Sequence, residues 1–150
     1  MAQKRKTDQS QVSAAAALLK KLEEKTTREV KNRLSDQWRD NLFEILMTRM
    51  DLVAPDKKAY AAIPAMLRKE PKAIPAFAKQ FFRTMRNILK LAKAPASPPH
   101  IIGLSVLYAS VVDIFIKDNA KDHAKTMAAL DQRLGLFERF SDCISCTGRK

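Results

Sequence analysis

Four side chains are of types that could do metal or redox chemistry: Cys143 and Cys146 in a Cys-x-x-Cys pattern, together with His100 and His123. A structural zinc ion needs four ligands, and neither histidine stands at a ligand spacing from the cysteines. A redox-active Cys-x-x-Cys is expected near a βαβ pattern, for which the sequence gives no strand signal. We therefore expect no metal and no cofactor, and we assign residues 142–150 to a flexible C-terminal tail.

A nucleophile paired with a base is the other chemistry to consider. No recognisable motif places a serine or cysteine nucleophile beside His100 or His123. The 3 glycines are scattered singly, so the sequence contains no glycine-rich phosphate loop. The sequence therefore predicts a protein that is not an enzyme and has no catalytic residues.

A row of basic residues recurs at spacings of four, three and four: Lys79, Arg83, Arg86 and Lys90. The row follows one side of a predicted amphipathic helix whose other side carries phenylalanines. Such a row is either an ordinary solvated face or a contact for phosphates or anionic lipid head groups. The formal net charge of +12 permits an anionic partner, such as an anionic membrane surface, but identifies none.

The elements that must position these residues are helices. Long segments rich in Ala, Leu, Lys and Glu, with few glycines, predict an all-α protein, which we interpret as a six-helix bundle. Ser13, Ser35 and Ser97 are candidate N-caps, and Pro64 predicts a kink or break. The expected helices cover residues 10 or 13 to 34, 36–53, 55–69, 71 or 75 to 94, 98–117 and 121–140.

The chain is expected to form one domain over residues 10–141, preceded by a basic flexible tail over residues 1–9. The first 12 residues are polar and charged, so no signal peptide is visible. Two cysteines do not form a disulfide framework, and we expect a reducing, cytoplasmic location.

Methionine and aromatic side chains are concentrated in the predicted second to fourth helices. Such side chains can line an adaptable apolar pocket, although they also serve as ordinary core. A pocket of this kind would take a hydrophobic small molecule or a lipid. The candidate pocket residues are Leu46, Met50, Tyr60, Met66, Phe77, Phe81 and Met85.

The stretch HIIGLSVLYASVVDIFI, residues 100–116, is apolar almost all the way round and contains one acid, Asp113. It is short for a membrane span and includes a charge, so we expect a buried helix. A helix this apolar either lies at the centre of the bundle or is half-buried and meets a second subunit. On the next predicted helix, an apolar seam at spacings of three, four and three consists of Met127, Leu130, Leu134 and Phe137.

Three stretches occur together in an order that resembles the C-terminal domain of TetR/AcrR-type transcriptional regulators. They are RDNLFEILMTRMDLVAP (39–55), LRKEPKAIPAFAKQFFRTMRNILKLA (67–92) and KDHAKTMAALDQRL (121–134). The similarity covers roughly residues 35–140, and its most specific motifs are Leu-Phe-x-x-Leu-Met and Thr-Met-Ala-Ala-Leu-Asp. The resemblance implies an all-α domain that binds a small hydrophobic ligand between its helices. It also implies dimerisation through the last two long helices, residues 98–117 and 121–140. The implied interface residues are Leu104, Tyr108, Val111, Met127, Leu130, Leu134 and Phe137.

The ubiquinone-biosynthesis lipid-binding proteins that share the TetR fold are similar too. Residues 93–103, KAPASPPHIIG, depart from the aromatic and threonine-rich signature of those proteins. TetR-type regulators also begin with a three-helix DNA-binding domain, for which the 34 residues before Ser35 leave no room. The chain is therefore expected to be a fragment or a protein without a helix-turn-helix, and not to bind specific DNA sequences alone.

The sequence thus predicts a TetR-like ligand-binding and dimerisation module of a transcriptional regulator. It would form a homodimer, or a heterodimer with a full-length relative. The alternative is a ubiquinone-biosynthesis-type lipid-binding accessory protein that acts at a membrane surface.

Overall fold

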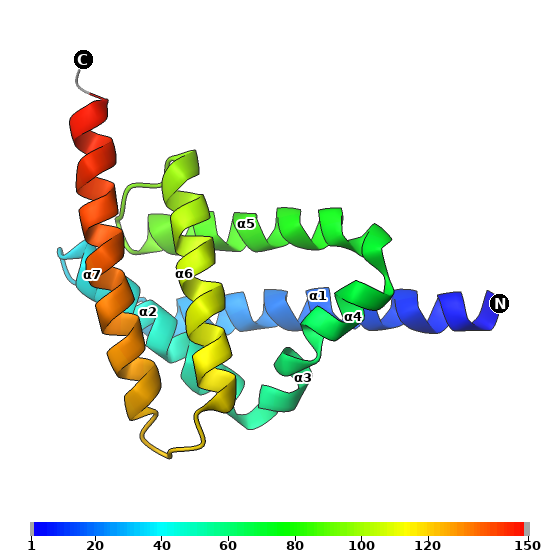
Figure 1. The fold of residues 1–150 in the computed structure, drawn as a ribbon. Helices are drawn as coiled ribbons and strands as arrows, with labels where there is room; N and C mark the ends of the chain where they lie inside the picture. Colours follow the sequence, from blue (N-terminus) through cyan, green and yellow to red (C-terminus); the bar gives the residue numbers. More distant parts are fainter. Residues whose placement is uncertain (1, 149–150) are drawn as a thin grey trace.

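The computed structural model describes residues 2–148, with side chains for all of them except residues 2–9 and 11. Five long α-helices form most of the molecule, and two short α-helices and two 3-10 turns connect α2 to α5 (Figure 1). The elements are α1 (Ala2–Val30), α2 (Trp38–Val53), η1 (Ala54–Asp56), α3 (Lys57–Ala61), α4 (Ile63–Lys69), η2 (Pro71–Ala73), α5 (Ile74–Leu91), α6 (Pro98–Lys117) and α7 (Ala124–Thr147).

The all-α prediction is confirmed, whereas the predicted count of six helices is wrong. The helix expected over residues 55–69 is divided at Ala62 into α3 and α4. Pro64 lies in the first turn of α4, where its missing N–H costs nothing, and it cannot continue the hydrogen bonds of α3.

The outer ends of α1 and α7 extend past the predicted boundaries. α1 begins at Ala2, so residues 2–9 of the predicted tail are helical and Ser13 lies inside the helix. α7 continues to Thr147, so residues 142–147 are helical as well. Residues 1 and 149–150 of the two predicted tails lie outside the described residues.

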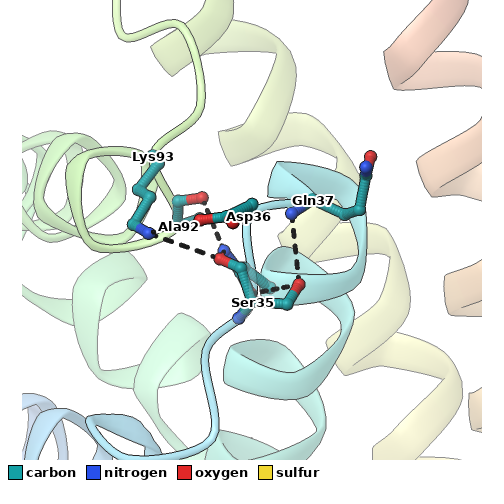
Figure 2. Close-up of polar contacts among 6 residues, drawn as sticks. Ser35, Asp36, Gln37, Ala92 and Lys93 are labelled. Atoms are coloured by element: carbon teal, nitrogen blue, oxygen red, sulfur yellow. Dashed lines mark hydrogen bonds and ion pairs between the residues drawn. The ribbon is translucent and has the colours of Figure 1, made fainter.

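A polar junction joins the start of α2 to the end of α5 (Figure 2). Ser35 was expected to cap α2, but α2 begins at Trp38, and the Ser35 hydroxyl instead accepts a hydrogen bond from the Gln37 N–H at 3.1 Å. The buried Asn41 side chain accepts from the Ser35 N–H at 2.7 Å and donates to the carbonyls of Ser35 and Ala92 at 2.9 and 3.1 Å. Because a buried amide is costly unless it is hydrogen-bonded, this junction fixes α2 against α5.

α2 is the central helix of the bundle and packs against α1, α5, α6 and α7. Figure 1 shows α6 and α7 as an antiparallel pair that stands across α1 and α5, with α1 and α5 running in the same direction. The α2 core residues are Leu42, Ile45, Leu46, Met50 and Val53. The core continues with Met85, Ile88 and Leu89 of α5, Leu104, Val111 and Phe115 of α6, and Leu130, Leu134 and Phe137 of α7.

α6 has two apolar faces, one inside the bundle and one outside. Leu104 and Val111 are fully buried, whereas Ile102 and Val106 are 57% and 66% exposed. Among the described helices, α6 is long and apolar enough to cross a membrane. The core helix of a soluble protein can have the same length and composition, and the inner face of α6 packs on α2 and α5. The structure therefore places residues 100–116 as a half-buried helix and not at the centre.

Asp118 fixes the turn between α6 and α7. Its carboxylate accepts hydrogen bonds from the Thr126 hydroxyl at 2.8 Å, the Thr126 N–H at 3.1 Å and the Ala120 N–H at 3.1 Å. The bond from the Thr126 hydroxyl is the main cause that lowers the pKa of Asp118 below its ordinary value of 3.8. Lys57 donates to the carbonyls of Phe115 and Asp118 at 2.9 and 2.7 Å, which ties the turn to α3.

Candidate functional site

Arg49 of α2 is the most unusual polar residue in the molecule. Its side chain is 2% exposed and stands in the apolar stripe of the central helix, three residues after Leu46 and four before Val53. Its Nε donates to the Tyr108 hydroxyl at 3.4 Å, and its guanidinium carbon lies 5.5 Å from the centre of the Tyr108 ring. Its Nη1 is buried without a hydrogen-bond partner, and no ion pair among the described side chains includes it.

Aromatic side chains lie on the Tyr108 side of Arg49. The Tyr108 ring lies 6.1 Å from the ring of Phe81. Burial is the main cause that raises the pKa of the Tyr60 hydroxyl above 10.0, with a further rise from Tyr108, and the positive charge of Arg49 opposes this rise. Tyr60, Phe81 and Tyr108 thus share one environment with Arg49, and two of them are predicted pocket residues.

A cavity of about 440 Å³ lies between α1, α2 and α5 and includes Arg49 in its wall. The remaining lining residues are Glu23, Thr26, Thr27, Ile45, Asn87, Ile88, Lys90 and Leu91. Lys90 and Thr27 are exposed, so the cavity opens to solvent on this side. Its volume lies within the range of about 300–1,000 Å³ that is typical of small-molecule sites.

The structure places the predicted pocket residues in several different surroundings. Leu46, Met50 and Met85 are buried in the core. Tyr60, Met66, Phe77 and Phe81 are half-buried. Phe77 lines a separate crevice of about 420 Å³ between α1, η2 and α5. Sequence reasoning missed Arg49, although a cation within the apolar stripe of residues 42–53 was a usable signal.

The outer face of α6 and α7 is a second candidate site. We call it the α6–α7 face, and it consists of Ile102, Val106, Leu136 and Phe140, which are 57%, 66%, 59% and 41% exposed. Three of these four, with Gly103, Leu107, Ser110, Arg133 and Phe137, line a shallow hollow of about 520 Å³. The Arg133 guanidinium in this hollow donates to the Ser110 hydroxyl at 2.6 Å.

The predicted interface residues lie mostly on the opposite side of the same two helices. Six of the seven are buried within the chain's own core, although Phe137 also lines the hollow of the α6–α7 face: Leu104, Tyr108, Val111, Leu130, Leu134 and Phe137. Met127 is exposed, and it lines a different hollow between α2 and α7. The helices on which we predicted an interface thus carry an exposed apolar face, but other residues form it.

The four predicted basic residues share the exposed side of α5. Lys79, Arg83, Arg86 and Lys90 are all exposed, and none takes part in an ion pair with a described side chain. Phe82 lies among them and is 42% exposed, although the sequence suggested that the phenylalanines face the other way.

The cysteines and histidines considered for chemistry do not converge. Cys143 and Cys146 are free and exposed on the last turns of α7, and the described side chains include no cluster of three metal-ligating residues. His100 lies between α6 and α7, where its Nε2 is 3.0 Å from the Ser141 hydroxyl. Burial lowers the pKa of His100. Because Ser141 is itself buried, a substrate would reach this pair only by separating α6 from α7.

Comparisons with protein-family models, curated proteins and solved structures give no match to this chain. The resemblance of residues 35–140 to the TetR C-terminal domain therefore stays a prediction made from sequence motifs.

Proposed function

We propose that the chain is a TetR-like dimerisation and ligand-binding module of a transcriptional regulator, in which two copies pair through the α6–α7 face. The observation that supports pairing is the row of exposed Ile102, Val106, Leu136 and Phe140 on two adjacent helices. Single exposed apolar side chains are common on soluble proteins, but a continuous apolar patch over two helices marks an interaction surface.

A second copy of the chain suits this face better than an unrelated partner. An antiparallel helix pair that packs on an identical pair through a two-fold axis forms a four-helix bundle, in which the same patch serves both subunits. Gly103 lets Phe137 and Phe140 of α7 pack directly on the backbone of α6, because a Cβ there would lie 3.1 Å from each ring. Arg133 already has Ser110 as a hydrogen-bond partner, so a subunit that covers the face would not leave this guanidinium without one. A full-length relative with the same face would pair in the same way.

Sedimentation velocity at micromolar concentration tests the pairing. The wild-type chain should sediment as a dimer, and the variant Val106→Glu/Leu136→Glu should sediment as a folded monomer, because two buried charges per subunit would meet across the axis. Ala17→Glu, an exposed change on α1, adds a charge away from α6 and α7; it is the control and should stay dimeric. A wild-type chain that is monomeric throughout this range would overturn the pairing proposal.

A second candidate function is a lipid-binding accessory role at an anionic membrane surface. The supporting observation is the exposed Phe82 beside the unpaired Lys79, Arg83 and Arg86 on α5. A basic helix face with an aromatic side chain is the composition of helices that lie in the head-group region. Each basic residue near an anionic surface contributes about 1 kcal/mol.

Flotation with vesicles tests this second function. Vesicles that contain phosphatidylglycerol should bind the chain, vesicles of phosphatidylcholine alone should not, and added salt should release it. Arg83→Glu/Arg86→Glu should abolish flotation, whereas Phe82→Ala should weaken it and preserve the salt dependence. Equal flotation of the double variant and the wild type would exclude this mechanism.

A further inference from the structure

We infer that Arg49 anchors a binding site for a small amphipathic monocarboxylate in the cavity between α1, α2 and α5. The carboxylate would meet the buried guanidinium, and the apolar body would occupy the rest of the cavity. This inference specifies the ligand of the module proposed above and rests on its ligand-binding role, but it does not require pairing through the α6–α7 face.

The first step of the argument is the missing partner of Arg49. An arginine in a protein keeps its charge at all ordinary pH values, so burial cannot be relieved by loss of a proton. Buried charges are normally paired and hydrogen-bonded because removing them from water is costly. Arg49 has the Tyr108 hydroxyl and ring on one side and a buried, unpartnered Nη1. A carboxylate that entered the cavity would supply the missing negative charge to this guanidinium.

Glu23 is the one acid in the lining of this cavity, and it is held elsewhere. Its carboxylate accepts hydrogen bonds from the Thr84 hydroxyl at 2.9 Å and from the Asn87 amide at 2.7 Å, so both of its oxygens are bound to α5. It forms no ion pair with Arg49. With Glu23 negative and both Arg49 and Lys90 positive, the lining carries one net positive charge, which matches a monoanion.

The rest of the lining describes the body of the ligand. Ile45, Ile88 and Leu91 present apolar surface. The hydroxyls of Thr26 and Thr27 donate to backbone carbonyls of their own helix at 2.7 and 2.9 Å, so they offer the cavity acceptor lone pairs and not free donors. The site is therefore built for one acidic group on a mainly apolar molecule.

Isothermal titration calorimetry of the full chain with decanoate and with decanol tests the inference. The two probes share one apolar chain and differ in charge, and decanoate should bind at least about tenfold more tightly, because a hydrogen bond to a charged group contributes more than a neutral one. Arg49→Met should remove this preference, so that both probes bind with similar affinity. The matched control Arg68→Met, an exposed change on α4, should leave both affinities unchanged.

Each other outcome has a distinct meaning. If the wild type binds decanol and decanoate equally, the ligand-binding role stands and the assignment of Arg49 as its anchor is overturned. If it binds neither probe, both are overturned, while the sedimentation test of pairing is unaffected. Should Arg49→Met fail to fold, Leu91→Trp fills the cavity with Arg49 in place, and it should remove decanoate binding; retained binding in that variant would refute the site.

Discussion

Replacement of Arg49 by methionine should make the unliganded chain more stable, although Arg49 is one of the most buried side chains in the molecule. Methionine is unbranched and fills irregular space without a charge or a hydrogen-bond donor. The prediction follows from the unpartnered Nη1, because a buried group without a partner destabilises the fold that contains it.

The magnitude follows from the contacts of Arg49. The variant loses the long Nε bond to Tyr108, about 0.5–1.5 kcal/mol, and the cation–π contact, about 0.5–2 kcal/mol. It is relieved of an unsatisfied buried donor, about 1–3 kcal/mol, and of part of the desolvation of a charge, about several kcal/mol when complete, because Arg49 lies in the wall of a cavity that opens to solvent. We therefore expect the free energy of unfolding to rise by about 1–3 kcal/mol.

Urea unfolding, followed by the fluorescence of Trp38, measures this increase in the free energy of unfolding; Trp38 is the single tryptophan of the chain. The midpoint should increase while the m value stays the same. Leu46→Ala, a truncation on the same helix, is the control and should cost about 2–5 kcal/mol. A loss of about 3–5 kcal/mol in Arg49→Met is the cost of breaking a buried pair, and it would show that Arg49 already has a partner within the chain.

Three further predictions concern stability and pH. Burial lowers the pKa of His100, so the unfolded chain binds this proton at a higher pH than the folded chain. The free energy of unfolding should therefore be highest above about pH 6.5 and should fall as the pH drops below that value. Urea unfolding at about pH 7 and 5 measures this decrease, which His100→Gln should lack. Hydrogen bonds lower the pKa of Asp118, so its contribution to the free energy of unfolding is present above about pH 3.8 and is lost in stronger acid. Asp118→Asn should be less stable than the wild type at neutral pH. In a circular dichroism titration, its stability should depend less on pH in the acid range. Gly135→Ala should raise the free energy of unfolding by about 0.5–1 kcal/mol in thermal unfolding, because an added Cβ meets nothing within 4 Å. Gly103→Ala should raise it by less, because its Cβ would lie 3.1 Å from Phe137. A larger increase for Gly103→Ala than for Gly135→Ala would contradict this reasoning.

The first residue of α6 was predictable from a proline in the sequence. Residues 98–117 were expected to form one helix, and α6 spans Pro98–Lys117, because Pro98 is favoured in a first turn. The basic row of α5 is exposed as its periodicity indicates, since Lys79 and Arg83 fall on one side of an amphipathic helix. Both predictions use local chemistry that does not depend on distant parts of the chain.

The side of α6 that faces the core could not be predicted in this way. Residues 100–116 are apolar on every side, so the sequence does not distinguish Leu104 and Val111, which are buried, from Ile102 and Val106, which are exposed. The choice depends on where α2 and α5 meet α6, which is a property of the whole bundle. Most of the predicted interface residues therefore face the core, whereas Ile102 and Val106 of the same helix are exposed and were not predicted.

Arg49 shows the opposite case, in which a local signal was present and was not used. A charged residue on a surface helix reaches water by extending its side chain, so basic residues are usually interpreted as surface. α2 is covered by α1, α5, α6 and α7, and from its apolar stripe a side chain can approach solvent only where two covering helices leave a gap. The cavity between α1 and α5 is such a gap, and Arg49 lies in its wall. Burial at this position makes the unpaired guanidinium destabilising, and for the same reason a ligand with one negative charge would bind most favourably there.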